Sequence, residues 1–215
     1  MKTILFQGDS VTDAGRNYED TYYLGTGYPH LVMAQLGYEH PGEYAFVNRG
    51  INGSRIPDIY ARIVRDIIKI KPDYMSLLIG VNDYWHGVDW GGVNGTGYKR
   101  FRKVYNILLD ELAEELPDMK IMIMEPFALP GVATNPTAED PDRYKNFRKG
   151  VEGYAKICRE IAEERGIKFI PLQAKFDELC KKAEPINWLI DGVHPTPMGH
   201  EMIKREWLKA FDEIK

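Results

Sequence analysis

Short β-forming apolar runs alternate with longer stretches of helical periodicity along this chain, and this alternation constrains the fold more than any other feature. We expect strands near 3–7, 45–48, 74–79, 120–124 and 168–171, and helices near 26–36, 57–70, 98–115, 142–165, 174–182 and 197–214. Strands that alternate with helices form a parallel sheet covered on both faces. The sequence therefore predicts an α/β fold, a three-layer α/β/α sandwich around a five-stranded parallel sheet.

Two of the expected strands carry this prediction most directly. The runs "MSLLIG" (75–80) and "KIMIME" (120–125) are apolar almost throughout instead of alternating with polar residues, as burial on both faces requires. The chain has 215 residues without an internal repeat, so we expect a single domain over 1–215. The proline-containing stretch 126–141 is interpreted as a loop over one end of the sheet, not as a domain boundary.

Composition and charge exclude several classes of partner. The formal net charge is −4, and the basic residues are scattered among acidic ones, so there is no basic stripe for nucleic acid. No run approaches the roughly 20 apolar residues of a membrane span, and the first residues lack the roughly 7–15 apolar residues of a signal-peptide core. Cys158 and Cys180 fall in expected helices. We expect a reduced, cytoplasmic protein without a membrane or nucleic-acid partner.

Polar residues and glycines follow the expected strands, at positions where α/β proteins commonly form ligand-binding and catalytic sites. In open parallel α/β sheets, ligands bind beyond the carboxyl ends of the strands. The chain carries polar corners at Gly8-Asp9-Ser10, at Asn48 to Gly53, at Gly80-Val81-Asn82-Asp83, and at Asp191 to Thr196 before the last helix. We expect these corners to share one end of the sheet.

Ser10 is the candidate nucleophile. The stretch Ser10-Val11-Thr12-Asp13 also matches a helix-capping pattern, so a structural role is the alternative. The other serines, Ser54 and Ser76, do not lie in a Gly-x-Ser-x-Gly elbow, which excludes the lipase-type arrangement.

A serine hydroxyl needs a base, and the base needs a group that orients its ring. Asp191 and His194 are three residues apart on an expected turn, so the carboxylate can reach Nδ1 while Nε2 points at the serine. Of the other histidines, His30 and His200 fall in expected helices, whereas His40 and His86 fall in expected loops.

Attack on an ester carbonyl creates an oxyanion, which needs preorganised hydrogen-bond donors. Gly53 offers a backbone N–H that no Cβ shields, and Asn82 offers a side-chain amide. A turn glycine and a turn asparagine are the structural alternatives. Asp83 is expected to cap a helix or a turn.

The four corners, in this order, resemble the motif blocks of the GDSL or SGNH hydrolase family. The blocks read Gly8-Asp9-Ser10, Asn48-x-Gly50-x-x-Gly53, Gly80-x-Asn82-Asp83 and Asp191-x-x-His194-Pro195. The resemblance implies a flavodoxin-like sandwich, with Ser10 as nucleophile, His194 as general base and Asp191 as its partner. It also implies an oxyanion hole from the Ser10 and Gly53 N–H groups and the Asn82 amide, and no metal or other cofactor.

A narrower resemblance concerns the substrate. The segments "GDSVTDAGR", "LGTGY", "VNRGINGSRIPDI", "KPDYMSLLIGVNDYW" and "DGVHPTPMGH" are similar to those of bacterial intracellular enzymes that deacetylate xylo-oligosaccharides. This implies an acetyl esterase acting on a small acetylated sugar through an acyl-enzyme on Ser10, and it admits a homo-oligomer. Aromatic faces stack on sugar rings, so candidate substrate-binding residues are Tyr28, Tyr84, Trp85, Trp90 and Trp188. Asp9, next to Ser10, is a further candidate.

Several other functions remain as alternatives. A general short-chain or lipid-type GDSL esterase, of the lysophospholipase or thioesterase kind, would keep the same blocks. A non-catalytic flavodoxin-like binding module would have no need for the serine, aspartate and histidine together. A metal-dependent hydrolase could use Asp9, Asp83, Asp191 and His194, but it lacks a familiar ligand spacing. The glycine-rich stretch 91–97 is not followed by the Lys-Ser/Thr of a nucleotide-binding P-loop.

Overall fold

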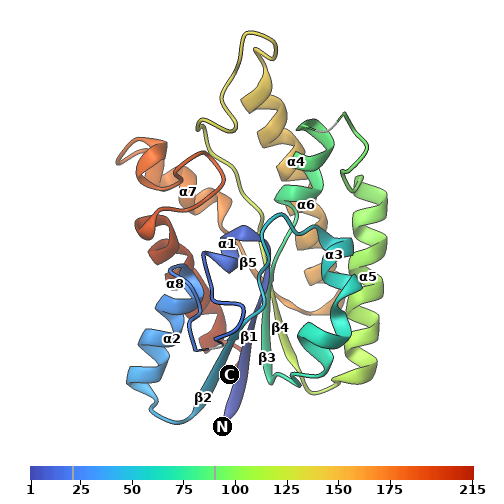
Figure 1. Ribbon diagram of the computed structural model, residues 1–215, viewed down its shortest axis with the longest axis vertical. Helices are drawn as coiled ribbons and strands as arrows, with labels where there is room; N and C mark the ends of the chain where they lie inside the picture. Colours follow the sequence, from blue (N-terminus) through green and yellow to red (C-terminus); the bar gives the residue numbers. More distant parts are fainter. Residues whose placement is uncertain (21, 90) are drawn as a thin grey trace.

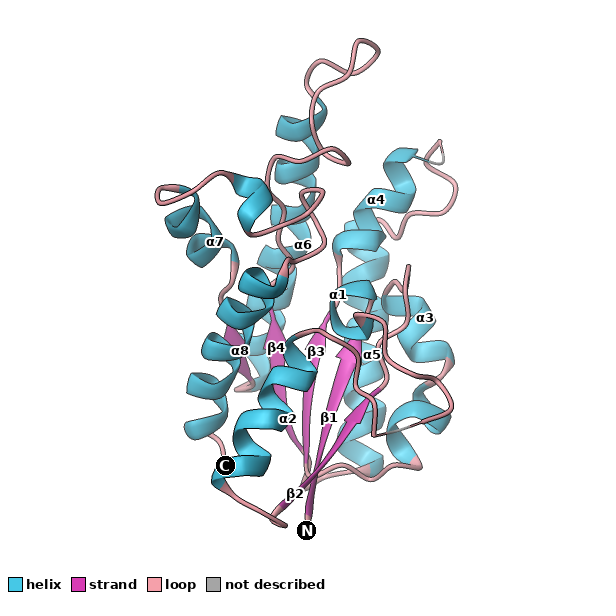
Figure 2. Ribbon diagram, turned by 60° about the vertical axis from the view of Figure 1, so that its left-hand side comes forward, coloured by secondary structure: helices cyan, strands magenta, loops and turns pink. Residues whose placement is uncertain are grey.

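The structure is a computed structural model that describes residues 1–20, 22–89 and 91–215. Within these ranges it contains a sheet of five parallel strands in the order β2-β1-β3-β4-β5, drawn in magenta in Figure 2. The strands are β1 (Lys2–Gly8), β2 (Tyr44–Asn48), β3 (Tyr74–Leu78), β4 (Lys120–Met124) and β5 (Lys168–Ile170). The chain order reverses between β1 and β3, so the ligand-binding crevice of such a sheet is expected at their carboxyl ends.

Helices cover both faces of the sheet (Figure 1). One layer contains α2 (Tyr28–Glu39), α7 (Gln173–Cys180) and α8 (Pro197–Asp212), and the other contains α3 (Ile56–Ala61), α5 (Tyr98–Glu115) and α6 (Arg143–Arg165). Shorter elements are α1 (Ser10–Asp13), α4 (Val81–Asp89), the π-helix η1 (Val64–Ile68) and the 3-10 helix η2 (Pro185–Asn187). The layered arrangement confirms the predicted sandwich.

Alternation along the strands explains why both faces are covered. Successive side chains of a strand point to opposite faces. In β1, Ile4 and Phe6 belong to the core beneath α2 and α8, whereas Leu5 belongs to the core beneath α3 and α5. In β4, Met122 and Met124 face the first core and Ile123 the second. Burial on both faces therefore makes these strands apolar at most of their buried positions.

Most element bounds agree with the sequence-based expectation to within a few residues, and β4 and α5 agree at both ends. The expected helix over 57–70 is divided into α3 and η1. Helix α4 was not expected, and it places His86 in a helix and not in a loop. In the described ranges, no helix combines the length and apolar character that a bilayer crossing requires.

Candidate active site

The corners expected to carry chemistry meet at the carboxyl ends of β1 and β3, where α1 and α4 begin (Figures 1 and 2). Strand β1 ends at Gly8, at which a Cβ would lie 2.4 Å from the Thr12 hydroxyl oxygen and 2.5 Å from the Leu78 carbonyl oxygen. The chain can make this tight turn only because residue 8 has no side chain. Ser10 is consequently the first residue of α1.

Asp9, and not Ser10, caps helix α1. Its Oδ1 accepts a hydrogen bond from the Val11 N–H at 3.0 Å, and its side chain is buried, with 1% exposed. Burial raises the pKa of Asp9 to about 7, against the opposing effect of this hydrogen bond. Because the cap is supplied by the neighbouring residue, the Ser10 hydroxyl is left for other contacts.

Ser10, His194 and Asp191 form a continuous hydrogen-bonded chain. The Ser10 Oγ lies 2.9 Å from His194 Nε2, and His194 Nδ1 lies 2.7 Å from Asp191 Oδ2. The other carboxylate oxygen, Oδ1, accepts from the backbone N–H groups of Val193 at 2.9 Å and His194 at 2.8 Å. An ionised carboxylate at Nδ1 assigns the imidazole proton to Nδ1, so Nε2 can accept the serine proton.

The hydrogen bonds among these three residues shift the pKa values of Asp191 and His194 in opposite directions. Partial burial by itself would raise the pKa of Asp191, but the hydrogen bonds from the His194 side chain and from two backbone N–H groups lower it to about 2. The hydrogen bond to Asp191 raises the pKa of His194 above its usual value, against the effect of burial. By contrast, burial lowers the pKa of His200 to about 4, and its Nδ1 accepts from the Tyr28 N–H at 3.1 Å. His194 is thus the histidine suited to act as a base.

The raised pKa of His194 has a measurable consequence. A general base must be neutral, and protonation below its pKa removes it. We expect kcat/KM for p-nitrophenyl acetate to fall on acidification, with a midpoint above the reference histidine pKa of about 6.5. A pH profile of kcat/KM tests this, and a midpoint at or below that value would contradict a raised pKa of His194 caused by its hydrogen bond to Asp191.

The loop after β2 carries Gly53, a candidate oxyanion donor. Gly53 has a φ of +74°, in the left-handed region that glycine adopts readily. Asn48 holds the loop in place, donating to the Thr12 carbonyl at 2.7 Å and the Leu24 carbonyl at 2.9 Å while accepting from the Gly50 N–H at 2.9 Å. The β2 corner is thereby tied to the end of α1.

Asn82, the second residue of α4, supplies another donor. Its Nδ2 donates to the Ser54 carbonyl at 3.2 Å, which orients the amide and leaves its second N–H for another acceptor. Within the part of the chain that the structure describes, the backbone N–H groups of Ser10 and Gly53 donate to no protein acceptor. Donors of this kind stabilise a developing oxyanion.

Ser10, Gly53 and Asn82 line a cavity of about 620 Å³. Its wall is completed mainly by one face of helix α4. The Trp85 ring centroid is 6.1 Å from that of His194, and the Trp85 indole N–H donates to Asp89. The lining residues are Ser10, Ala14, Asn52, Gly53, Asn82, Trp85, His86, Asp89 and His194.

Of the candidate substrate-binding residues, Trp85 alone among those that the structure describes lines this cavity. Tyr28 is completely buried in the core beneath α2 and α8, so its ring cannot stack on a substrate, contrary to expectation. Asp9 lies buried at the cap of α1 and does not line the cavity. Trp90 falls outside the described residues.

The packing of Tyr84 and Trp188 contradicts the expectation that these two side chains bind the substrate in this cavity. Tyr84 points away from the cavity: its ring contacts Phe147 edge-on at 5.3 Å, and its hydroxyl donates to the Asn146 carbonyl at 3.0 Å. Trp188 lines a separate groove with Leu179 and Met202.

The cavity residues that sequence reasoning missed follow from the unexpected helix. Residues 82, 85, 86 and 89 are spaced by three and four along α4 and therefore share one face. His86 and Asp89 reach the cavity in this way, together with Asn82 and Trp85. A helical assignment starting at Val81 would have identified them from spacing alone.

The arrangement bears on the metal alternative as well. Asp83 is buried at the start of α4, where its two carboxylate oxygens each accept from the Ile56 N–H at 3.2 Å, and burial raises its pKa to about 8. Among the described residues, no group of three or more histidine, cysteine, aspartate or glutamate side chains is arranged to hold a metal ion. Asp9, Asp83, Asp191 and His194, the donors named for that alternative, are therefore not brought together as such a group.

Comparison with known proteins identifies the family to which the chain belongs. A model of the GDSL-like lipase/acylhydrolase family matches residues 6–202. An acetylxylan esterase from Geobacillus stearothermophilus is 34% identical over 222 residues, covering 97% of this chain and 93% of that protein.

Solved structures show the same likeness. The crystal structure of an acetylxylan esterase from Geobacillus stearothermophilus has a TM-score of 0.84 and 31% identity, covering 97% of this chain and 93% of that one. An alpha/beta hydrolase from the metagenome of Lake Arreo, Spain, has a TM-score of 0.85 and 26% identity, covering 100% and 96%. The chain therefore belongs to the GDSL-like lipase/acylhydrolase family and is a carboxylic ester hydrolase.

Proposed function

We propose that this enzyme removes acetyl groups from carbohydrate esters, xylo-oligosaccharides above all, through an acyl-enzyme on Ser10. The observation that carries the proposal is the 2.9 Å contact of the Ser10 Oγ with a histidine whose other ring nitrogen is held by Asp191. This contact opens on a cavity that also contains oxyanion donors. The likeness to acetylxylan esterases supports the choice of acyl group.

The reaction follows from the positions of these groups. The Ser10 Oγ attacks the acetyl carbonyl carbon while its proton passes to His194 Nε2. The N–H groups of Ser10 and Gly53 and the Asn82 amide receive the negative oxygen. Collapse of the tetrahedral intermediate breaks the ester C–O bond, and the departing sugar oxygen takes the proton from His194. A water molecule then repeats the sequence against acetyl-Ser10 and releases acetate.

The cavity wall favours the acetyl ester of a sugar over an ester of a fatty acid. Its volume of about 620 Å³ is in the usual range for small-molecule sites. The Trp85 indole, tethered by its N–H to Asp89, offers a flat apolar surface of the kind on which pyranose rings stack. His86 and Asp89 also line the cavity and supply polar groups for sugar hydroxyls.

A comparison of substrates tests this proposal. We expect kcat/KM to be highest for acetylated xylo-oligosaccharides, lower for acetylated glucose, and lowest for p-nitrophenyl octanoate, with EDTA present throughout. Trp85→Ala should raise KM for the oligosaccharide by roughly threefold to tenfold, the size of one stacking contact, and leave KM for p-nitrophenyl acetate nearly unchanged.

The matched control is Trp188→Ala, because Trp188 lines a separate groove and its removal should change neither value. Comparable rates on acetate and octanoate esters would instead support the lipid-type or general esterase. Loss of turnover in EDTA would support the metal-dependent alternative.

A further inference from the structure

The turn at residues 128–134, which follows β4, packs directly on the backbone of the catalytic carboxylate. The Ala133 N–H donates to the Asp191 carbonyl at 3.0 Å, and the Leu129 N–H donates to the Gly192 carbonyl at 2.9 Å. These bonds hold the two residues that precede Val193 and His194. The orientation of the Asp191 side chain depends on this backbone.

The 128–134 turn and the backbone of Asp191 and Gly192 are packed so closely that no additional side-chain atom fits between them. A Cβ on Gly131 would lie 2.1 Å from the Asp191 carbonyl carbon and 2.3 Å from its oxygen. Gly192 has a φ of +101°, and a Cβ there would lie 2.5 Å from the Thr134 hydroxyl oxygen. Two glycines that face each other across the contact allow the backbones to approach this closely. A small displacement of the turn must therefore displace Asp191.

The turn is held in shape from inside. Thr134 is completely buried, and its hydroxyl donates to the Leu129 carbonyl at 2.6 Å. The backbone N–H groups of Thr134 and Asn135 both donate to the Gly131 carbonyl, at 2.9 and 2.7 Å. The threonine hydroxyl thus joins the two ends of the turn, and it adjoins Gly192.

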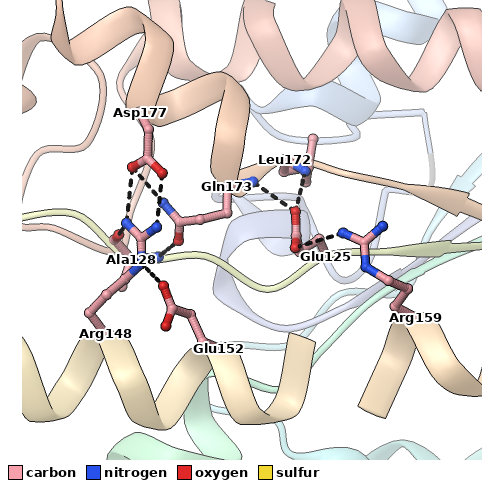
Figure 3. Close-up of polar contacts among 8 residues, drawn as sticks. All are labelled: Glu125, Ala128, Arg148, Glu152, Arg159, Leu172, Gln173 and Asp177. Atoms are coloured by element: carbon pink, nitrogen blue, oxygen red, sulfur yellow. Dashed lines mark hydrogen bonds and ion pairs between the residues drawn. The ribbon is translucent and has the colours of Figure 1, made fainter. Parts of the chain in front are cut away.

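One end of the turn is anchored between helices α6 and α7 (Figure 3). The Ala128 N–H donates to the Gln173 side chain at 2.9 Å, and the Ala128 carbonyl accepts from Arg148 at 3.3 Å. Arg148 also binds both carboxylate oxygens of Asp177, at 3.0 and 2.8 Å. Glu125, at the end of β4, accepts from the Leu172 and Gln173 N–H groups at 2.7 and 2.9 Å.

The other end is linked to the cavity wall. The Arg143 Nε donates to the Ala133 carbonyl at 3.0 Å, and an Nη of the same guanidinium lies 2.9 Å from Asp89 Oδ1. Asp89 lines the cavity and accepts from the Trp85 indole. Arg143 therefore bridges the substrate-facing side of α4 and the turn that holds Asp191.

We propose that the 128–134 turn is a positioning element that holds the Asp191 carboxylate behind His194, with Thr134 and Arg143 as its positioning residues. The proposal rests on the proposed function in one respect, namely that Ser10, His194 and Asp191 are the catalytic residues. If the turn loosens, the Asp191–His194 hydrogen bond weakens, and with it the cause that raises the pKa of His194. The carboxyl of Asp9 and the imidazole of His200 also act on His194, but neither is part of the turn.

The variant Thr134→Val tests the proposal, because it keeps the shape of the side chain and removes the hydroxyl. We expect kcat for p-nitrophenyl acetate to fall between about tenfold and a hundredfold, the usual cost of slight misplacement in a catalytic group, with KM nearly unchanged. The acid limb of the kcat/KM profile should move to lower pH. Thr134→Ser, which retains the hydroxyl, should restore both properties.

If Thr134 only stabilised the fold, its replacement would not move the acid limb of the pH profile. A control variant that destabilises the fold elsewhere tests this point. Leu112→Ala removes a completely buried side chain of α5 in the other core, and it should lower the melting temperature while leaving the acid limb in place. An unchanged acid limb and kcat in Thr134→Val would overturn the proposal. If that variant does not fold, Arg143→Gln, whose side chain is partly exposed, must show the same shift of the acid limb.

A readout without turnover separates this proposal from the proposed function. The protonation of the His194 ring can be followed by NMR in the wild type and in Thr134→Val. A lower His194 pKa in the variant supports the positioning role even if no ester were hydrolysed by the wild type, which would refute the proposed function alone. Identical His194 titrations would overturn the positioning role.

Discussion

Replacement of Ser10 by alanine is expected to lower kcat on acetyl esters by several orders of magnitude, on the order of 10⁴ to 10⁶, as loss of the nucleophile does in other triads. The Oγ is the atom that His194 Nε2 contacts at 2.9 Å, and alanine leaves nothing there to acylate. Folding should be retained, because Asp9 supplies the cap of α1 through its own side chain. The measurement is initial acetate release, together with the melting temperature of both proteins.

Ser76→Ala serves as the matched control for this prediction. Ser76 is completely buried within β3 and does not line the cavity, so its replacement should leave kcat within about twofold, as expected for a side chain that shares no contact with the reacting groups. Mass spectrometry of the wild type mixed rapidly with p-nitrophenyl acetate should find an acetyl group on residue 10. Turnover of the Ser10→Ala protein close to that of the wild type would refute the assignment of the nucleophile.

Replacement of Asp191 by asparagine is expected to lower kcat by about 10⁴ while KM changes little, as the corresponding change does in a triad with this geometry. Asparagine can donate its amide N–H to Nδ1, which favours the tautomer with the proton on Nε2. That tautomer cannot accept the Ser10 proton. The variant also removes the main cause that raises the pKa of His194, so the residual activity should have its acid limb at lower pH.

The control for this prediction removes another carboxylate from an ion pair. Asp110 pairs with Arg165 at 2.7 Å on the exposed surface of α5, and Asp110→Asn should leave both kcat and the pH profile unchanged. Melting temperatures separate loss of catalysis from loss of structure. A fall of less than about tenfold in the Asp191→Asn protein would show that His194 does not need the carboxylate, since tenfold corresponds to only about 1.4 kcal/mol of barrier.

The sandwich could be predicted because helices cover both faces of its strands, which makes the strands largely apolar. Met75 and Leu77 of β3 face one helical layer while Tyr74 and Leu78 face the other, so the run is apolar on both faces. Helix α4 lacks such a signal. Asn82, Asp83 and Gly87 are weak helix formers, and the helix is secured by contacts with distant segments, such as the Ile56 N–H on Asp83. Tertiary contacts of this kind do not appear in local periodicity.

The residues of the candidate site likewise fall into those that local sequence predicts and those that only tertiary contacts place. The pattern Asp191-x-x-His194 and the tight corner at Ser10 are local, and a turn or a helix start dictates their geometry. The substrate-facing aromatics are not local. Tyr28 and Trp85 have similar chemistry and both follow glycine-containing corners, but the first is completely buried in the core between the sheet and helices α2 and α8, while the second lines the cavity. Only the packing of the helices on the sheet separates them.

The amino-acid sequence by itself determined the layered parallel sheet, the corners that carry polar chemistry, and the pairing of Asp191 with His194. These features depend on burial periodicity and on backbone conformations that neighbouring residues impose. Only the tertiary structure decided that His194 meets Ser10 across 184 residues of chain, that one face of α4 forms the cavity wall, and that the 128–134 turn lies against Asp191. Contacts between distant segments depend on how the helices pack, because no local interaction specifies the distance between them.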